Sequence, residues 1–237
     1  MSQSLLFAPA VPVPPRVGTY RTILADPPWL ERGGGQIKRG ADRHYPLMPT
    51  ADICRLPVSG WAAPDAHLYL WVTNNFLAAG LEVMKAWGFR YVTKIDWYKG
   101  YFDVEAGDVL LAALKAMRHQ ARMSDTDVEA LANQTFVEMQ ETTCTPDLDD
   151  DLQIGLGQYF RGCTESCLFG VRGKLPYRLR ENGKRAQGRT GLHAPRGEHS
   201  AKPEKFRAVI EAVSHGPYLE LFARRDVPNW DVWGNEC

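Results

Sequence analysis

The stretch "LADPPWLERGGG", residues 24–35, places a carboxylate, two prolines and a tryptophan directly after an apolar run. An exocyclic amine of a nucleobase is a poor nucleophile, because its lone pair is delocalised into the ring. Asp26 could accept one amino hydrogen and a neighbouring backbone carbonyl the other, which would direct the lone pair at an electrophilic methyl group. Pro27 and Pro28 would hold those carbonyls rigidly, and Trp29 would offer a flat surface to an unstacked base. The residues predict alkylation of an amine of adenine, cytosine or glutamine, without a metal or a covalent intermediate.

Apolar runs and helical patterns alternate along the chain. The strands and helices that they predict must position the stretch at residues 24–35. Residues 20–25 predict a buried strand that ends at Asp26. Further strands are expected at 66–73, 90–97, 165–171, 218–222 and 230–233. Helices are expected at 75–87, which Gly88 ends, and at 203–214, which has a proline in its first turn. This alternation favours an α/β fold with a mostly parallel sheet covered on both faces, where ligands bind at strand ends.

Length and composition predict one globular domain. The chain has 237 residues, 44% hydrophobic and 24% charged, and no apolar run long enough to span a membrane. Residues 1–17 are interpreted as an extended arm and residues 18–237 as a single domain, with Trp71 and Trp97 in its core. The five cysteines lack zinc-like spacing, so we expect reduced thiols in a cytoplasmic protein.

Residues 101–153 interrupt the alternation of strands and helices. They hold 12 acidic and 3 basic residues, although the whole chain has no net charge. Val109–Met117 has a helical pattern, and Ser124 could cap a second helix. Their apolar residues are too many for two solvated helices. We therefore expect an acidic helical insertion at about 101–153 that packs on itself, on the catalytic domain or on a second subunit, as in a homodimer or heteromer.

Two basic segments could contact nucleic acid. Residues 172–207 hold 11 basic and 3 acidic residues, with Arg178 and Arg180 as candidate phosphate ligands. The glycine-rich segment 30–44 carries Arg39 and is interpreted as a mobile lid over a base. The alternative for the first segment is an ordinary solvated surface.

Seven ordered segments together resemble the adenine N(6)-methyltransferases of the MT-A70 family, in a bacterial or phage-like form. They cover about residues 20–100 and 154–236: "YRTILADPPW", "HYPLM", "LYLWVTN", "AWGFRYVTKIDWYK", "GLGQYFRGCTESCLFGVRGK", "EHSAKPEKF" and "LELFARR…NWDVWGNE". The resemblance implies a Rossmann-like methyltransferase fold in permuted order, with the catalytic segment first and the cofactor segment last. The chain departs from the family at "RRDVPNW", which is shorter and lacks a His-Asn pair, and the acidic insertion has no counterpart.

The resemblance also implies roles for individual residues. The catalytic tetrad is matched by Asp26, Pro27, Pro28 and Trp29. The positions that contact S-adenosyl-L-methionine are matched by Asp26, Lys202, Phe222, Arg224, Asn235 and Glu236. Substrate contacts are expected from Trp29, Tyr45, Arg39, His199, Arg178 and Arg180.

These residue types suit the cofactor. Glu236 follows the last expected strand and could accept hydrogen bonds from ribose hydroxyls. Asn235 and Arg224 could bind the sugar or adenine, and Asp26 could also contact the cofactor's ammonium. Lys202 lies at a helix start, which suits the methionine carboxylate.

The sequence thus predicts transfer of a methyl group to the 6-amino group of adenine in nucleic acid, with no membrane partner. DNA is favoured over RNA, because the compact chain shows no RNA-binding appendage. The same reaction on RNA is one alternative. A non-catalytic partner subunit that binds nucleic acid is another, although the intact DPPW tetrad argues against it.

Overall fold

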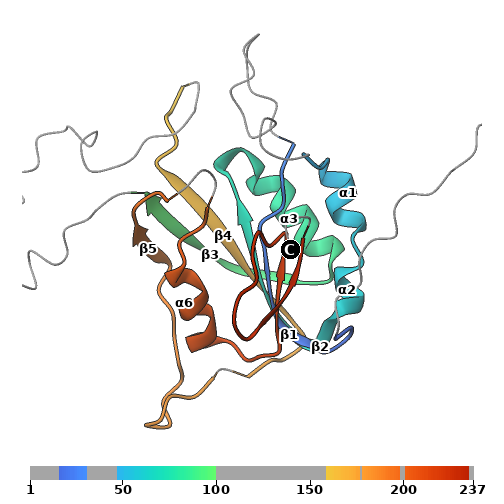
Figure 1. The fold of residues 1–237 in the computed structure, drawn as a ribbon, viewed down its shortest axis with the longest axis vertical. Coiled ribbons are helices and arrows are strands. Elements are labelled where there is room, and N and C mark those ends of the chain that lie inside the picture. Colours follow the sequence, from blue (N-terminus) through green and yellow to red (C-terminus); the bar gives the residue numbers. More distant parts are fainter. Residues whose placement is uncertain (1–15, 31–46, 100–158, 177, 198–200, 235–237) are drawn as a thin grey trace, which may run out of the picture. The chain divides into compact units, whose positions relative to one another are not determined.

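A computed structural model describes residues 16–30, 47–99, 159–176, 178–197 and 201–234. Its centre is a seven-stranded sheet of order β5-β3-β4-β2-β1-β6-β7 (Figure 1). The strands are β1 (Tyr20–Ala25), β2 (Ala62–Val72), β3 (Arg90–Lys99), β4 (Thr164–Arg172), β5 (Gly191–Ala194), β6 (Tyr218–Leu221) and β7 (Trp230–Trp233). The predicted α/β fold class is confirmed.

The chain divides into two compact units. The first comprises Met1–Trp97, Thr164–Leu192 and Lys202–Cys237, and it contains most of the sheet. The second comprises Tyr98–Cys163 and His193–Ala201. In the second unit the Tyr98 ring stacks on His193 with centroids 4.9 Å apart, and the Lys99 N–H donates to the Cys163 carbonyl. The division into an arm over 1–17 and a single domain over 18–237 stays a prediction, and the insertion at 101–153 lies outside the described residues.

Strand β1 lies between two parallel neighbours. Ala25, its last residue, pairs with Leu70 of β2 on one side and with Leu221 of β6 on the other. The chain runs from β1 to β2, whereas β6 and its parallel neighbour β7 lie on the opposite side. The carboxyl ends of β1 and β6 therefore form a topological switch point, where open α/β sheets bind their ligands.

One face of the sheet is covered by apolar helices. The helices on that face are α1 (Thr50–Arg55), α2 (Val58–Trp61) and α3 (Leu77–Ala86), with a short 3-10 turn, η2 (Asn74–Phe76), before α3. Leu68, Leu70 and Val72 of β2 form one core with residues of these helices. The contact is close, because a Cβ on Gly80 would lie 2.5 Å from Val72 Cγ1.

The other face of β2 is covered by α6 (Lys205–Val213). Tyr69 and Trp71 alternate with the apolar residues above and meet Phe206 of α6, with ring centroids 6.1 Å and 4.8 Å away. Trp71 and Trp97 are 1% and 2% exposed, so their predicted place in the core is confirmed. Figure 1 shows α6 on the sheet apart from α1, α2 and α3.

Most differences from the sequence prediction concern short elements. Strand β2 begins at Ala62 rather than at residue 66, and its register with β1 shifts between Tyr20 and Thr22, beside the exposed Pro64 and Asp65. Helices α1 and α2 and strand β5 were not predicted, since four to six residues give too little periodicity. Strand β4 is antiparallel to β2, whereas β2, β1, β6 and β7 pair in parallel.

No helix in the described part of the chain is long and apolar enough to cross a membrane.

A buried polar cluster lies between β2 and the end of α6. Ser214 Oγ is 2.8 Å from both His67 Nδ1 and the Tyr69 hydroxyl, and His67 packs edge-on against Phe169. Burial, and then the neighbouring His215, lower the pKa of His67 from 6.5 to about 4. The folded protein therefore holds this imidazole neutral.

We expect this histidine to make the protein acid-sensitive. Above pH 6.5 the imidazole is neutral in both states, but between pH 6.5 and 4 only the unfolded chain takes up the proton. Relative to a His67→Gln variant, the wild type should lose about 3 kcal/mol of unfolding free energy between pH 7 and pH 4. Urea titrations at several pH values measure this difference, with the exposed His193→Gln as control. Equal pH slopes for wild type and His67→Gln would refute it.

Candidate active site

Asp26 stands at the carboxyl ends of two adjacent parallel strands. It follows β1 directly, and its N–H donates to the Leu221 carbonyl of β6 at 3.4 Å. The two prolines form a fixed turn, because Pro27 O accepts from the Trp29 N–H at 2.9 Å and Pro28 O from the Met48 N–H at 2.7 Å. Each carbonyl has a second lone pair, so both could still accept from a substrate.

Trp29 is built into the protein interior. Its side chain is 6% exposed, its indole N–H donates to the Trp71 carbonyl at 3.0 Å, and its ring stacks on Phe76 at 5.4 Å. These contacts tie the DPPW turn to the end of β2 and to η2. They favour a role in holding the turn, and the stacking of a target base on Trp29 stays a prediction.

Lys202 joins two carboxylates at this edge of the sheet. Its Nζ is 2.8 Å from Asp26 Oδ2 and 3.3 Å from Glu165 Oε2, and it lies 5.6 Å from the centroid of the Trp71 ring. The side chains of Lys202, Asp26 and Glu165 are 18%, 28% and 16% exposed. The cluster is thus shielded from solvent without being sealed from it.

The charges of the cluster are strongly coupled. Burial lowers the pKa of Lys202, but the charges of Asp26 and Glu165 outweigh burial and hold that pKa above its ordinary value. Lys202 is therefore protonated at neutral pH. Burial raises the pKa of the Asp26 carboxyl, and the ammonium of Lys202 opposes that rise. Lys202 thus both orients Asp26 and favours its charged form.

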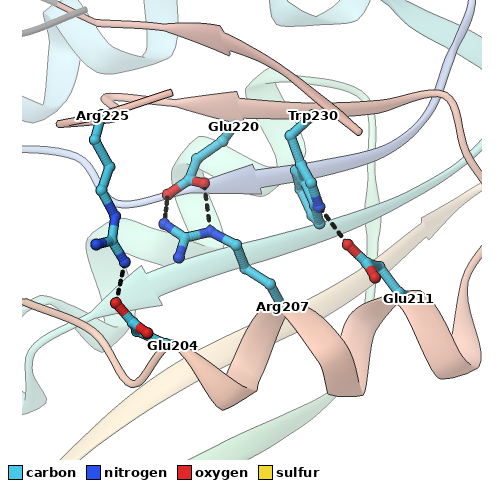
Figure 2. A network of polar contacts seen from close by, with 6 residues as sticks. All are labelled: Glu204, Arg207, Glu211, Glu220, Arg225 and Trp230. Carbon is cyan, nitrogen blue, oxygen red and sulfur yellow. Dashed lines mark hydrogen bonds and ion pairs between the residues drawn. The ribbon is translucent and has the colours of Figure 1, made fainter. Parts of the chain in front are cut away.

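A polar network holds the helix that follows Lys202. Arg207 of α6 donates to both carboxylate oxygens of Glu220 on β6, at 2.7 Å and 2.8 Å (Figure 2). Glu204 pairs with Arg225, and Glu211 accepts from the Trp230 indole N–H at 2.7 Å. Residues along α6 therefore bond to β6 and to the chain that follows β6. These bonds fix the position of the helix, and so of Lys202, which precedes it.

The turn after β6 holds two further predicted cofactor residues. Phe222 adopts a left-handed backbone with φ of 62° and meets the Trp233 ring edge-on at 5.4 Å. Arg224 is exposed, and its charge also acts on Asp26. The structure thus brings Asp26, Lys202 and the turn at Phe222 and Arg224 to the same switch point.

Arg178 and Arg180 lie elsewhere in the first unit. They belong to a short hairpin in which Leu179 faces Arg185, and the Arg178 guanidinium donates to the Glu211 carbonyl near the end of α6. Lys202 precedes the opposite end of that helix. The remaining predicted site residues lie outside the described residues: Arg39, Tyr45, His199, Asn235 and Glu236, together with 31–44 of the predicted lid.

Glu165 is the site residue that the sequence reasoning missed. It is the second residue of β4, whose antiparallel pairing sets Ser166 opposite Val72 and so brings the start of β4 to the end of β2. A carboxylate beside the run "SCLFGV" was visible in the sequence, but the reversed direction of this strand was not.

Comparisons with known proteins agree with this architecture. A profile of the MT-A70 family matches residues 20–119 and 138–236. The chain is 25% identical over 239 residues to the type II methyltransferase M.MunI of Mycoplasma sp, covering 92% of this chain and 77% of that protein. It is 23% identical over 224 residues to the human N(6)-adenine-specific methyltransferase METTL4, covering 92% of this chain and 37% of that protein.

A third similarity is to the human N(6)-adenosine-methyltransferase catalytic subunit METTL3. The two are 22% identical over 227 residues, which cover 93% of this chain and 28% of METTL3. The chain thus spans well under half the length of either human protein.

Removal of the bridging ammonium should expose the repulsion between the two carboxylates. We expect Lys202→Met to lose about 2 kcal/mol of unfolding free energy relative to wild type at pH 8, because the variant lacks the ammonium that contacts both carboxylates. The loss should be smaller at pH 5, because the ammonium of Lys202 opposes the raised pKa of Asp26, and without that ammonium the carboxyl takes up a proton more readily as the pH falls. Urea unfolding at both pH values measures this, with the exposed Lys205→Met as matched control. A loss independent of pH would show that packing, not charge, is what Lys202 contributes.

Proposed function

This chain belongs to the MT-A70 family of methyltransferases, and on that premise we propose that it methylates the 6-amino group of adenine in nucleic acid. S-adenosylmethionine would supply a methyl group on a positively charged sulfur. The observation that carries the proposal is the carboxylate of Asp26, held at the switch point by Lys202 at 2.8 Å.

The residues around Asp26 suit the activation of an amine. An ionised carboxylate only accepts hydrogen bonds, so a fixed Asp26 would accept one from an amino hydrogen of adenine and orient that amine. The carbonyls of Pro27 and Pro28 lie in a turn that Met48 and Trp29 hold, and either could accept the second hydrogen. In this role the chain contributes positioning.

The polar side chains at the site also fit the proposed cofactor. Asp26 and Glu165 could accept from an ammonium group, and Arg224 could donate to ribose or adenine. Lys202 was expected to bind the methionine carboxylate, yet its ammonium already contacts two carboxylates. We therefore assign Lys202 first to the orientation of Asp26. Phe222, Asn235 and Glu236 remain candidates for the sugar and adenine.

Similarity favours DNA over RNA as the substrate. The match to a type II methyltransferase extends over 77% of that protein, so the two chains share most of their architecture. RNA is the second candidate, because the match to the N(6)-adenosine-methyltransferase METTL3 extends over 93% of this chain.

We expect Asp26→Asn to lower methyl transfer by about 100-fold or more, because an amide cannot replace the charge of the carboxylate. The assay follows labelled methyl from S-adenosylmethionine into duplex DNA, single-stranded DNA and RNA, and the modified base is then mapped. Asp226→Asn, an exposed change of the same kind, should retain wild-type turnover. Near-normal turnover by Asp26→Asn would remove the catalytic assignment. A wild type that methylates none of these would favour the non-catalytic alternative.

The basic hairpin offers a separate test of nucleic-acid binding. The Arg180 N–H donates to the Lys184 carbonyl at 2.9 Å, which sets these two cationic residues opposite each other beside the turn at Gly183. Two cations on a fixed hairpin suit contact with phosphates.

We expect Arg180→Ala with Lys184→Ala to weaken DNA binding and to flatten its dependence on salt concentration by about two charges. Fluorescence anisotropy over a range of salt concentrations measures both quantities. Lys85→Ala, an exposed change on α3, should alter neither. An unchanged salt slope in the double variant would assign the phosphate contacts to other residues.

A further inference from the structure

A short β-hairpin over residues 178–186 projects from the first unit beside the end of α6. The Ala186 N–H donates to the Arg178 carbonyl at 2.7 Å, and the Gly183 N–H donates to the Arg180 carbonyl at 2.9 Å, which closes the turn. Gly183 has φ of 72°, a left-handed conformation that favours glycine. Figure 1 shows the hairpin, in orange, extending past the end of α6. The hairpin therefore has a defined shape of its own.

The two faces of this hairpin differ. On the inner face, Ala186 is 5% exposed, and the Arg178 guanidinium donates to the Glu211 carbonyl of α6. Leu179 and Arg185 pair with each other across the hairpin. Because side chains alternate along each strand, this pair points away from the inner face, and its two side chains lie close together. Leu179 and Arg185 thus form an outer face that the contacts with α6 hold in a fixed orientation.

The hairpin combines an exposed apolar side chain with a high positive charge. Leu179 is 61% exposed, more than any other large apolar side chain in the described part of the first unit. Residues 178–189 hold five basic residues and one acidic residue. Contacts with phosphates need only the basic residues and give an apolar side chain no role. A leucine held among cations suits a ligand that presents an apolar surface beside its phosphates.

The major groove of duplex DNA is such a surface. It is about 12 Å wide and admits a two-stranded β-ribbon, whose strands lie about 4.8 Å apart. Phosphates line its edges, and each thymine presents a C5-methyl group on its floor. Duplex RNA fits less well, because its major groove is too narrow for side chains to read and its uracils lack that methyl group. Charge, ribbon width and apolar contact together favour duplex DNA.

We propose that the hairpin over residues 178–186 enters the major groove of duplex DNA and that Leu179 contacts a thymine methyl group there. The hairpin thereby selects the target sequence, in addition to the contacts that its cations make with phosphates. This inference rests on the proposed function, since it takes DNA to be the nucleic acid whose adenine reaches Asp26.

The position of the hairpin relative to Asp26 sets which bases it reads. Lys202 contacts Asp26 before α6 begins, and the hairpin bonds to Glu211 near the point where α6 ends. The nine residues of α6 span about 14 Å, which is the length of about four base pairs. The selected thymine therefore lies several base pairs from the methylated adenine.

A binding selection tests the proposal without requiring methyl transfer. The full chain captures DNA duplexes from a library of random sequence at one fixed salt concentration, and the bound duplexes are sequenced. A preferred duplex is then remade with uracil in place of each preferred thymine, which removes only the methyl group. We expect wild type to bind the uracil duplex about 4-fold more weakly, the effect of one buried methyl group. Leu179→Ala should bind both duplexes equally.

Three variants serve as controls. Leu179→Met retains an apolar side chain and should preserve the preference for thymine. Leu77→Ala removes an exposed leucine from α3, on the opposite face of the sheet, and should preserve it as well. Arg180→Ala with Lys184→Ala should weaken binding to both duplexes alike, because phosphate contacts do not depend on the base. Thermal melts establish that each variant is folded, and light scattering gives its mass.

The outcomes separate this inference from the proposed function. A wild type that selects no sequence, or a thymine preference that persists in Leu179→Ala, overturns the inference and leaves adenine methylation standing. A persisting preference together with a lower mass of Leu179→Ala would assign the outer face to a second subunit instead. A wild type that selects thymine through Leu179 but methylates no nucleic acid overturns the proposed function and not the inference.

Discussion

The ion pair between Lys202 and Asp26 joins residues that are 176 positions apart, and the rest of the site depends on it. It requires β1 and β6 to be adjacent, so that Asp26 follows one strand and the segment around α6 returns beside the other. Arg207 and Glu220 then fasten α6 to β6 through two hydrogen bonds. The carboxylate that we propose as catalytic is thus oriented by a residue whose own position is set by a separate, charge-assisted contact.

The two faces of the sheet serve different purposes. On the face of α1, α2 and α3, the packing is mainly apolar, with single indole hydrogen bonds such as that from Trp87 to the Ile53 carbonyl, and burial supplies most of the stabilisation. On the face of α6, polar groups such as His67, Tyr69 and Ser214 are buried and bonded to one another. Buried hydrogen bonds add little net stability but penalise alternative arrangements, because a shifted helix would leave them unpaired. The helix before which Lys202 lies is therefore placed more precisely than apolar packing alone would place it.

The same site works against the stability of the fold. Asp26 and Glu165 repel each other, and both lose hydration at the edge of the sheet. Lys202 offsets much of this cost through its contacts with both carboxylates.

The local order of residues by itself determined β1, the carboxylate at its end, the helix that Gly88 ends and the resemblance to a methyltransferase family. These features depend on neighbours in sequence, such as an apolar run that stops at "DPPW". The tertiary structure alone decided that Trp29 is buried on Phe76, that Lys202 contacts Asp26, and that β4 runs antiparallel to β2 and so brings Glu165 to the site. Strand direction and long-range ion pairs depend on the packing of segments far apart in the chain. They cannot be predicted from the spacing of residues within one segment.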